Sequence, residues 1–173
     1  MTMSPRIAAA AALLLASRAF ALDAPNVVPI DAQLVTSGQP TRTSLTHLRE
    51  EGFDAVIYLA PSTVEDAIQD EPALLRSQGI TFVHVPIVFS KPTPADVEAA
   101  AAALERLRGK KVLVHCQVNM RASSIVFLYR AIWRHEDPAK AYESVTRVWV
   151  PEGSWKRLIA DELKDHGIRF EPM

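Results

Sequence analysis

Three runs of hydrophobic residues, with few polar interruptions, dominate the middle of the chain. They are AVIYLA at 55–60, TFVHVPIVF at 81–89 and KVLVHC at 111–116, and a shorter candidate, LVT, lies at 34–36. Continuous rather than alternating hydrophobicity is typical of strands that are covered on both faces. We therefore predict three buried strands in a largely parallel sheet, with Pro86 marking the place where pairing of the second run weakens.

Segments with helical periodicity separate these runs and fill the chain after the last one. The clearest helix start is at Thr93, which can cap the helix, with Pro94 at its first position and Asp96 three residues after the cap. Beyond residue 121, ASSIVFLYRAIWRH, AKAYESVTRVWV and SWKRLIADELKDHG each have the pattern of a helix. The order predicts a single α/β domain with a parallel-rich central sheet, helices on both faces and a helical C-terminal third.

The composition limits the classes of protein to which the chain can belong, but it does not indicate a function. The chain has 173 residues, 49% of them hydrophobic, and a net charge of −1, which suits one domain with one sizeable core. No basic run stands out, so we expect no nucleic acid partner. A single cysteine in the chain also makes a structural zinc site improbable, and we expect neither a metal nor a cofactor.

The first 21 residues differ from the rest. MTMSPR carries one arginine, a short apolar run follows at 7–17, and Ala19 and Ala21 are the small residues that a signal peptidase inspects. The apolar run is too short to span a bilayer. We predict a signal peptide at 1–21 and a mature domain at 22–173 that is periplasmic or secreted, without stable membrane insertion after cleavage.

Candidate chemistry lies where the third strand ends. Cys116 closes that strand, Arg121 follows five residues later, and a helix is predicted to begin near Arg121. Backbone N–H groups of such a loop and of the helix start form a nest for an anion and stabilise a thiolate. Arg121 adds a planar fork for two anionic oxygens, and Asn119 is the loop residue best suited to the left-handed conformation. The alternative is that Cys116 is a small buried core residue.

The loop HCQVNMRASS, at 115–124, resembles the signature loop of the cysteine-dependent protein tyrosine phosphatase superfamily, in particular its small bacterial dual-specificity-like members. LVTSGQP (34–40), AAAAALERLRGKKVLVHC (99–116) and DPAKAYESVTRVW (137–149) extend the resemblance over most of the mature chain. The resemblance implies metal-independent hydrolysis of a phosphate monoester, with Cys116 as a nucleophile that forms a phosphocysteine. It also implies that the substrate is a phosphorylated protein or a small phosphoester.

The same resemblance assigns roles around the loop. Arg121 and the amides of the loop would hold the phosphate, His115 would tune the thiolate, and Ser123 or Ser124 would ease breakdown of the intermediate. The loop residues concerned are Gln117, Val118, Asn119 and Met120. Strand alternation places His115 on the opposite side of the sheet from Cys116. His84, inside the second hydrophobic run, is expected to be a core histidine with satisfied hydrogen bonds.

The loop departs from the phosphatase pattern in its length. Only four residues separate Cys116 from Arg121, where the phosphatase family normally has five. A six-residue loop that starts at cysteine resembles that of rhodanese-type sulfurtransferases, which carry a persulfide on the cysteine. Sulfur transfer through a Cys116 persulfide is therefore the alternative enzyme class.

The second departure concerns the general acid. The segment in which the family carries its aspartate reads IVFSKP here and contains no acidic residue. Asp96 lies nearby, although its position makes it a helix-capping residue first. Asp66 is the other candidate, on an acidic loop that also holds Glu65, Asp70 and Glu71. Without a substitute acid, the protein would be a catalytically weak, anion-binding pseudophosphatase.

Overall fold

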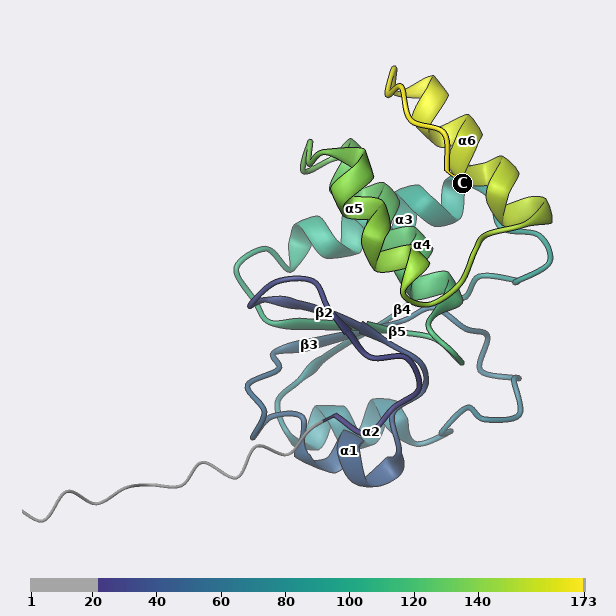
Figure 1. Ribbon diagram of the computed structural model, residues 1–173. Helices are drawn as coiled ribbons and strands as arrows, with labels where there is room; N and C mark the ends of the chain where they lie inside the picture. The colour runs from purple at the N-terminus through teal and green to yellow at the C-terminus, as the bar shows by residue number, and fades with distance from the viewer. Residues whose placement is uncertain (1–21, 173) are drawn as a thin grey trace, which may run out of the picture.

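The computed structural model describes residues 22–172, so the predicted signal peptide lies outside the described residues. One five-stranded sheet has the order β1-β2-β5-β3-β4 (Figure 1). The strands are β1 (Val28–Pro29), β2 (Leu34–Ser37), β3 (Ala55–Tyr58), β4 (Thr81–His84) and β5 (Val112–His115). The pairs β2–β5, β5–β3 and β3–β4 are parallel, whereas β1 pairs antiparallel with β2 at one edge. The sheet is thus parallel-rich, as the sequence predicted.

Helices cover both faces of the sheet. They are α1 (Arg42–His47), α2 (Glu71–Ser77), α3 (Pro94–Arg106), α4 (Met120–Ile132), α5 (Pro138–Thr146) and α6 (Gly153–Asp165). The first two lie on one side and the other four on the opposite side (Figure 1). Within this segment of the chain, no helix is long and apolar enough to cross a bilayer.

The central strand β5 contributes side chains to the hydrophobic clusters on both faces of the sheet. Val112 and Val114 pack in the cluster that includes α3, α4 and α6, while Leu113 packs with the leucines of α1 and α2. Successive side chains of a strand point to opposite faces, so a strand with helices on both sides must be hydrophobic at every position. The α/β class and the helical C-terminal third are therefore confirmed.

The second hydrophobic run departs from the prediction of a buried strand. Only 81–84 forms a strand, at the edge of the sheet, and its four side chains are exposed or half-exposed. Pro86 has no N–H group and cannot extend the ladder. The sheet contact nevertheless continues past it, because Ile87 is fully buried and its N–H donates to the carbonyl of Leu59 at 2.9 Å.

His84 is correspondingly not a core histidine. It is exposed, since an edge strand is covered by only one neighbour. Its hydrogen bonding is nevertheless satisfied, because Nε2 lies 2.8 Å from the carbonyl oxygen of Ala60. Its ring also stacks on Tyr58, with ring centroids 5.1 Å apart.

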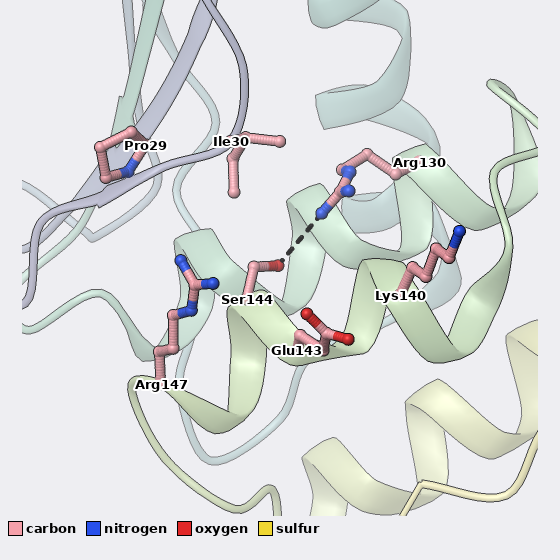
Figure 2. Close-up of a pocket in the computed structure, with 7 residues that line it drawn as sticks. All are labelled: Pro29, Ile30, Arg130, Lys140, Glu143, Ser144 and Arg147. Atoms are coloured by element: carbon pink, nitrogen blue, oxygen red, sulfur yellow. Dashed lines mark hydrogen bonds between the residues drawn. The ribbon is translucent and has the colours of Figure 1, made fainter.

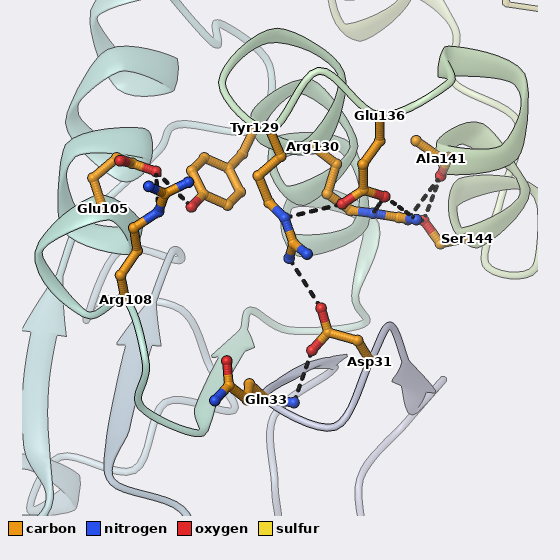
Figure 3. A network of polar contacts seen from close by, with 10 residues as sticks. Asp31, Gln33, Glu105, Arg108, Tyr129, Arg130, Glu136, Ala141 and Ser144 are labelled. Carbon is orange, nitrogen blue, oxygen red and sulfur yellow. Dashed lines mark hydrogen bonds and ion pairs between the residues drawn. The ribbon is translucent and has the colours of Figure 1, made fainter.

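A polar network ties the turn between β1 and β2 to the C-terminal end of α4 (Figure 3). The carboxylate of Asp31 accepts from the N–H of Gln33 at 2.7 Å and from Arg134 at 2.9 Å. Glu136 bridges Arg134 and Arg130. Partial burial by itself would raise the pKa of Asp31, but the bonds from Gln33 and Arg134 outweigh it and hold that pKa below its ordinary value. The network fixes the antiparallel edge of the sheet to the helical layer.

Candidate active site

The candidate site is the connection between β5 and α4. Cys116 directly follows β5 and is fully buried, and α4 begins at Met120 after only three more residues. Asn119 makes this short connection possible, since it has the predicted left-handed conformation (φ 71°, ψ 0°). Its side-chain amide donates to Thr36 Oγ1 at 3.0 Å and to the carbonyl of Asn26 at 2.6 Å. These two bonds hold the turn in its uncommon backbone conformation.

The segment before α1 braces the loop from outside. The N–H of Gln39 donates to the carbonyl of Gln117 at 2.9 Å, and the side chain of Asn26 donates to the carbonyl of Val118 at 3.0 Å. A Cβ atom at Gly38 would lie 2.6 Å from the carbonyl oxygen of Gln117, so no larger residue fits there. In the sequence, Gly38 and Gln39 appear only within the stretch LVTSGQP, and nothing in the linear pattern shows this role.

The brace also decides where the N–H groups of the loop point. In a trans peptide the C=O and N–H groups point in opposite directions, so the N–H of Val118 points away from Gln39. No backbone carbonyl in 22–172 accepts from the N–H of Val118, Met120 or Arg121. These N–H groups lie at the positive end of the α4 dipole, an arrangement that favours the binding of an anion.

Arg121 is held close to these N–H groups from the first turn of α4. It is 5% exposed, its Nε donates to the carbonyl of Ile87 at 3.0 Å, and its guanidinium carbon lies 5.1 Å from the centroid of the Phe89 ring. Nη1 makes a longer bond of 3.4 Å to Oε1 of Gln117. Two of its five N–H donors are thus occupied, and the others are free to bind an oxyanion.

The acidic residues proposed from sequence separate clearly in space. Asp66 reaches the signature loop, where its Oδ1 accepts from Nε2 of Gln117 at 3.0 Å. Asp96 instead completes the capping box of α3, accepting from the N–H of Thr93 at 2.8 Å. Asp70 forms an exposed salt bridge with Arg42, and Glu65 is exposed. Of the proposed acids, Asp66 is therefore the one that the structure brings to the loop.

Glu71 is buried on the other face of the sheet, beneath the loop. Its Oε1 lies 2.8 Å from Nε2 of His115, and its Oε2 accepts from Nε2 of Gln39 at 2.9 Å. His115 thus faces α2 whereas Cys116 packs in the opposite core cluster, as strand alternation predicted. Sequence analysis grouped Glu71 with the acidic loop, because nothing in a linear pattern shows that this carboxylate turns inward.

Tyr58 borders the same region from β3. It stacks on His115 with ring centroids 4.7 Å apart. Burial, and then the carboxylates of Asp66 and Glu71, raise the pKa of Tyr58 to about 12. Its phenol is therefore protonated throughout the neutral range and cannot serve as a base there.

The two serines after Arg121 differ in their bonding. Ser123 Oγ donates to the carbonyl of Met120 at 3.2 Å, which commits this hydroxyl to the first turn of α4. The hydroxyl of Ser124 is fully buried and has no hydrogen-bond partner among the described residues. Of this pair, Ser124 has the hydroxyl that is free to take another partner.

A separate pocket of about 370 Å³ lies between the end of β1 and α5 (Figure 2). Arg130, Lys140 and Arg147 contribute positive charge to it. However, Arg130 is already paired with Glu136, and Glu143 places a carboxylate among the cations. The pocket includes no residue of the Cys116 loop, so we do not assign the chemistry to it.

Comparison with known proteins agrees with the loop. A family model described as "DSP-PTPase phosphatase fused to NAD+ Kinase" matches residues 23–158. The chain belongs to this DSP-PTPase family. A solved DUF442 protein of Shewanella putrefaciens CN-32 is 31% identical, with a TM-score of 0.76, and the match covers 83% of this chain and 92% of that one.

Two further proteins match a part or most of the chain. A beta-lactamase hydrolase-like protein of Xylella fastidiosa (strain Temecula1) is 30% identical over 110 residues, or 62% of this chain. That match covers only 25% of the relative, so the chain spans about a quarter of its length. The core catalytic domain of the PP-IP phosphatase SIW14 from S. cerevisiae shares the fold, with a TM-score of 0.67 and 16% identity, over 84% of this chain and 93% of that one.

Proposed function

We propose that this domain hydrolyses phosphate monoesters through a phosphocysteine on Cys116. The observation that carries the proposal is the loop itself. A cysteine at a strand end, inward-facing amides and a buried Arg121 converge at the N-terminus of α4 in a chain that belongs to a phosphatase family. Each of these elements stabilises an oxyanion or a thiolate. Together they suit nucleophilic attack of a cysteine thiolate on phosphorus.

The reaction has two steps. The Cys116 thiolate attacks phosphorus and forms an S–P bond while the ester P–O bond breaks, and the departing alkoxide takes a proton. Arg121 and the loop amides stabilise the negative charge on the oxygens of the transferred group. Water then attacks phosphorus, the S–P bond breaks, and inorganic phosphate and the thiolate are released.

Asp66 is our candidate for the general acid of the first step and the base of the second. Its carboxylate is exposed to solvent and is held at the loop through Gln117. A carboxyl group in this position can donate to the leaving oxygen and later take a proton from the attacking water. Asp96 is less suitable, because its carboxylate also accepts from the hydroxyl of Thr93 at 2.8 Å.

Family membership favours phosphate over sulfur as the transferred group, although the loop has the length found in sulfurtransferases. We further propose that residues 1–21 direct the protein out of the cytoplasm.

The test is hydrolysis of p-nitrophenyl phosphate by residues 22–173 at mildly acid pH, beside Cys116→Ser. We expect turnover that the serine variant abolishes, and a phosphoenzyme that can be trapped by rapid acid quench. Absence of Cys116-dependent turnover would reject the proposal. Transfer of sulfur from thiosulfate to cyanide, measured on the same preparation, would then support the sulfurtransferase alternative.

A further inference from the structure

Exposed hydrophobic side chains occur in three segments that adjoin the candidate site, through the Cys116 loop itself or through the contacts of Phe89 with Arg121 and Trp149. In the part of the chain that the structure describes, four large hydrophobic residues stand exposed: Val88 (57%), Phe89 (37%), Val118 (41%) and Val150 (56%). They come from three separate segments, namely the loop between β4 and α3, the Cys116 loop and the loop between α5 and α6. Single exposed hydrophobic residues are ordinary, but a group of them at one site usually marks a binding surface.

Phe89 links two of these segments and the site. The centroid of its ring lies 5.8 Å from that of Trp149 and 5.8 Å from that of Trp155. The same ring also contacts the guanidinium group of Arg121. Nε1 of Trp155 donates to the carbonyl of Phe89 at 2.9 Å. The aromatic surface is therefore held in place before any ligand arrives.

We propose that the substrate carries a hydrophobic group next to its phosphate, and that Val88, Phe89 and Val150 contact this group. The inference rests on the proposed function, because it concerns the alcohol part of the same phosphoester. The phosphate binds in the loop, and Arg121 joins the two regions, since it lies in the first turn of α4 and also meets the Phe89 ring.

The deciding experiment measures binding, not turnover. Ethylphosphonate and hexylphosphonate, which cannot be hydrolysed, are titrated into residues 22–173 by calorimetry, below the concentration at which hexylphosphonate aggregates. Partial burial of each added methylene is worth about twofold in affinity, so we expect hexylphosphonate to bind on the order of tenfold more tightly. The double variant Val88→Thr/Val150→Thr keeps side-chain shape and removes exposed apolar surface, and should reduce this ratio to about threefold or less.

Ala139→Ser, an exposed exchange on α5, is the matched control and should leave the ratio unchanged. Equal affinities for the two phosphonates would overturn the inference, and so would a ratio that the double variant leaves intact. Binding of vesicles of neutral phospholipid with equal phosphonate affinities would indicate a membrane surface instead, and also overturns it. If hexylphosphonate binds more tightly but p-nitrophenyl phosphate is not hydrolysed, the proposed function fails while the hydrophobic subsite stands. If neither phosphonate binds, the inference fails, and hydrolysis of p-nitrophenyl phosphate still decides the proposed function.

Discussion

His115 and Glu71 form a fully enclosed pair directly behind Cys116. Their side chains are 0% and 2% exposed, with 2.8 Å between Nε2 and Oε1. The second oxygen of Glu71 accepts from Gln39, whose own N–H holds the carbonyl of Gln117. One buried carboxylate therefore connects the residue before the nucleophile with the brace of the loop, and we regard Glu71 as a positioning residue.

Glu71→Gln tests this connection. The Glu71 carboxylate offers an acceptor oxygen to both His115 and Gln39, whereas a glutamine side chain has one acceptor oxygen and one donor NH₂ group. In the variant, either His115 or Gln39 therefore loses its acceptor, or the ring proton of His115 moves from Nε2 to Nδ1. Nδ1 is buried and has no partner among the described residues, so each arrangement leaves a polar atom unpaired. We expect a loss of about 1–3 kcal/mol in the free energy of unfolding. We also expect a shift in the acid limb of the pH profile of kcat/KM, because the hydrogen-bond partner of His115, the residue before Cys116, is changed.

Asp70→Asn is the matched control, since Asp70 is the preceding residue and lies in an exposed salt bridge with Arg42. It should change neither the melting temperature nor the pH profile measurably. A Glu71→Gln variant that melts earlier but keeps the wild-type pH profile would show that Glu71 is structural only.

Asp66→Asn should have an effect that depends on the leaving group. Asparagine can still accept the bond from Gln117 but cannot donate a carboxylic proton, so the loop is kept and the acid is removed. We expect a fall in kcat of roughly 10²–10⁴-fold for phenyl phosphate and a much smaller fall for p-nitrophenyl phosphate. Glu65→Gln, one residue away, should behave as wild type. Equal losses on both substrates would show that Asp66 is not the acid.

Gly38→Ala should impair activity, whereas Gly79→Ala should lower stability without impairing activity. The added Cβ would meet the carbonyl of Gln117 at 2.6 Å and push on the loop, whereas at Gly79 an added Cβ meets nothing within 4 Å. Gly79 has φ of +72°, so Gly79→Ala costs about 1 kcal/mol through backbone strain alone. Comparing kcat/KM with melting temperature for both variants separates the two effects. Full activity in Gly38→Ala would argue against the brace.

Asp31 should stabilise the fold in a pH-dependent manner. Its pKa is below the ordinary value in the folded protein, so its contribution is present above the unfolded pKa of about 3.9 and is lost as the pH falls through the folded pKa. Asp31→Asn should therefore lower the free energy of unfolding at pH 7 by up to about 1 kcal/mol, and by progressively less below pH 4. Urea titrations of both proteins at pH 7 and pH 3 measure this difference. A constant difference would exclude the ion-pair explanation.

Features that depend on local pattern follow from the sequence alone. An uninterrupted hydrophobic run predicted β5 as a strand buried on both faces, and Thr93 with Asp96 predicted the start of α3, because these signals act between near neighbours. Asn119 was identified for the same reason, since few residues tolerate positive φ. Cys116 and Arg121 lie close in the chain, and their proximity in space follows from that.

Which residues from distant segments meet at the loop depends instead on how the whole chain packs. Asp66 and Glu71 lie on the same acidic stretch, yet one reaches Gln117 in solvent and the other is buried on His115. The run at 81–89 looked like a buried strand, but strand order places it at an edge, and periodicity carries no information on strand order. The brace from Gly38 and Gln39 joins segments almost eighty residues apart. Such contacts are set by how the layers pack, a property of the whole chain that no local pattern of residues encodes.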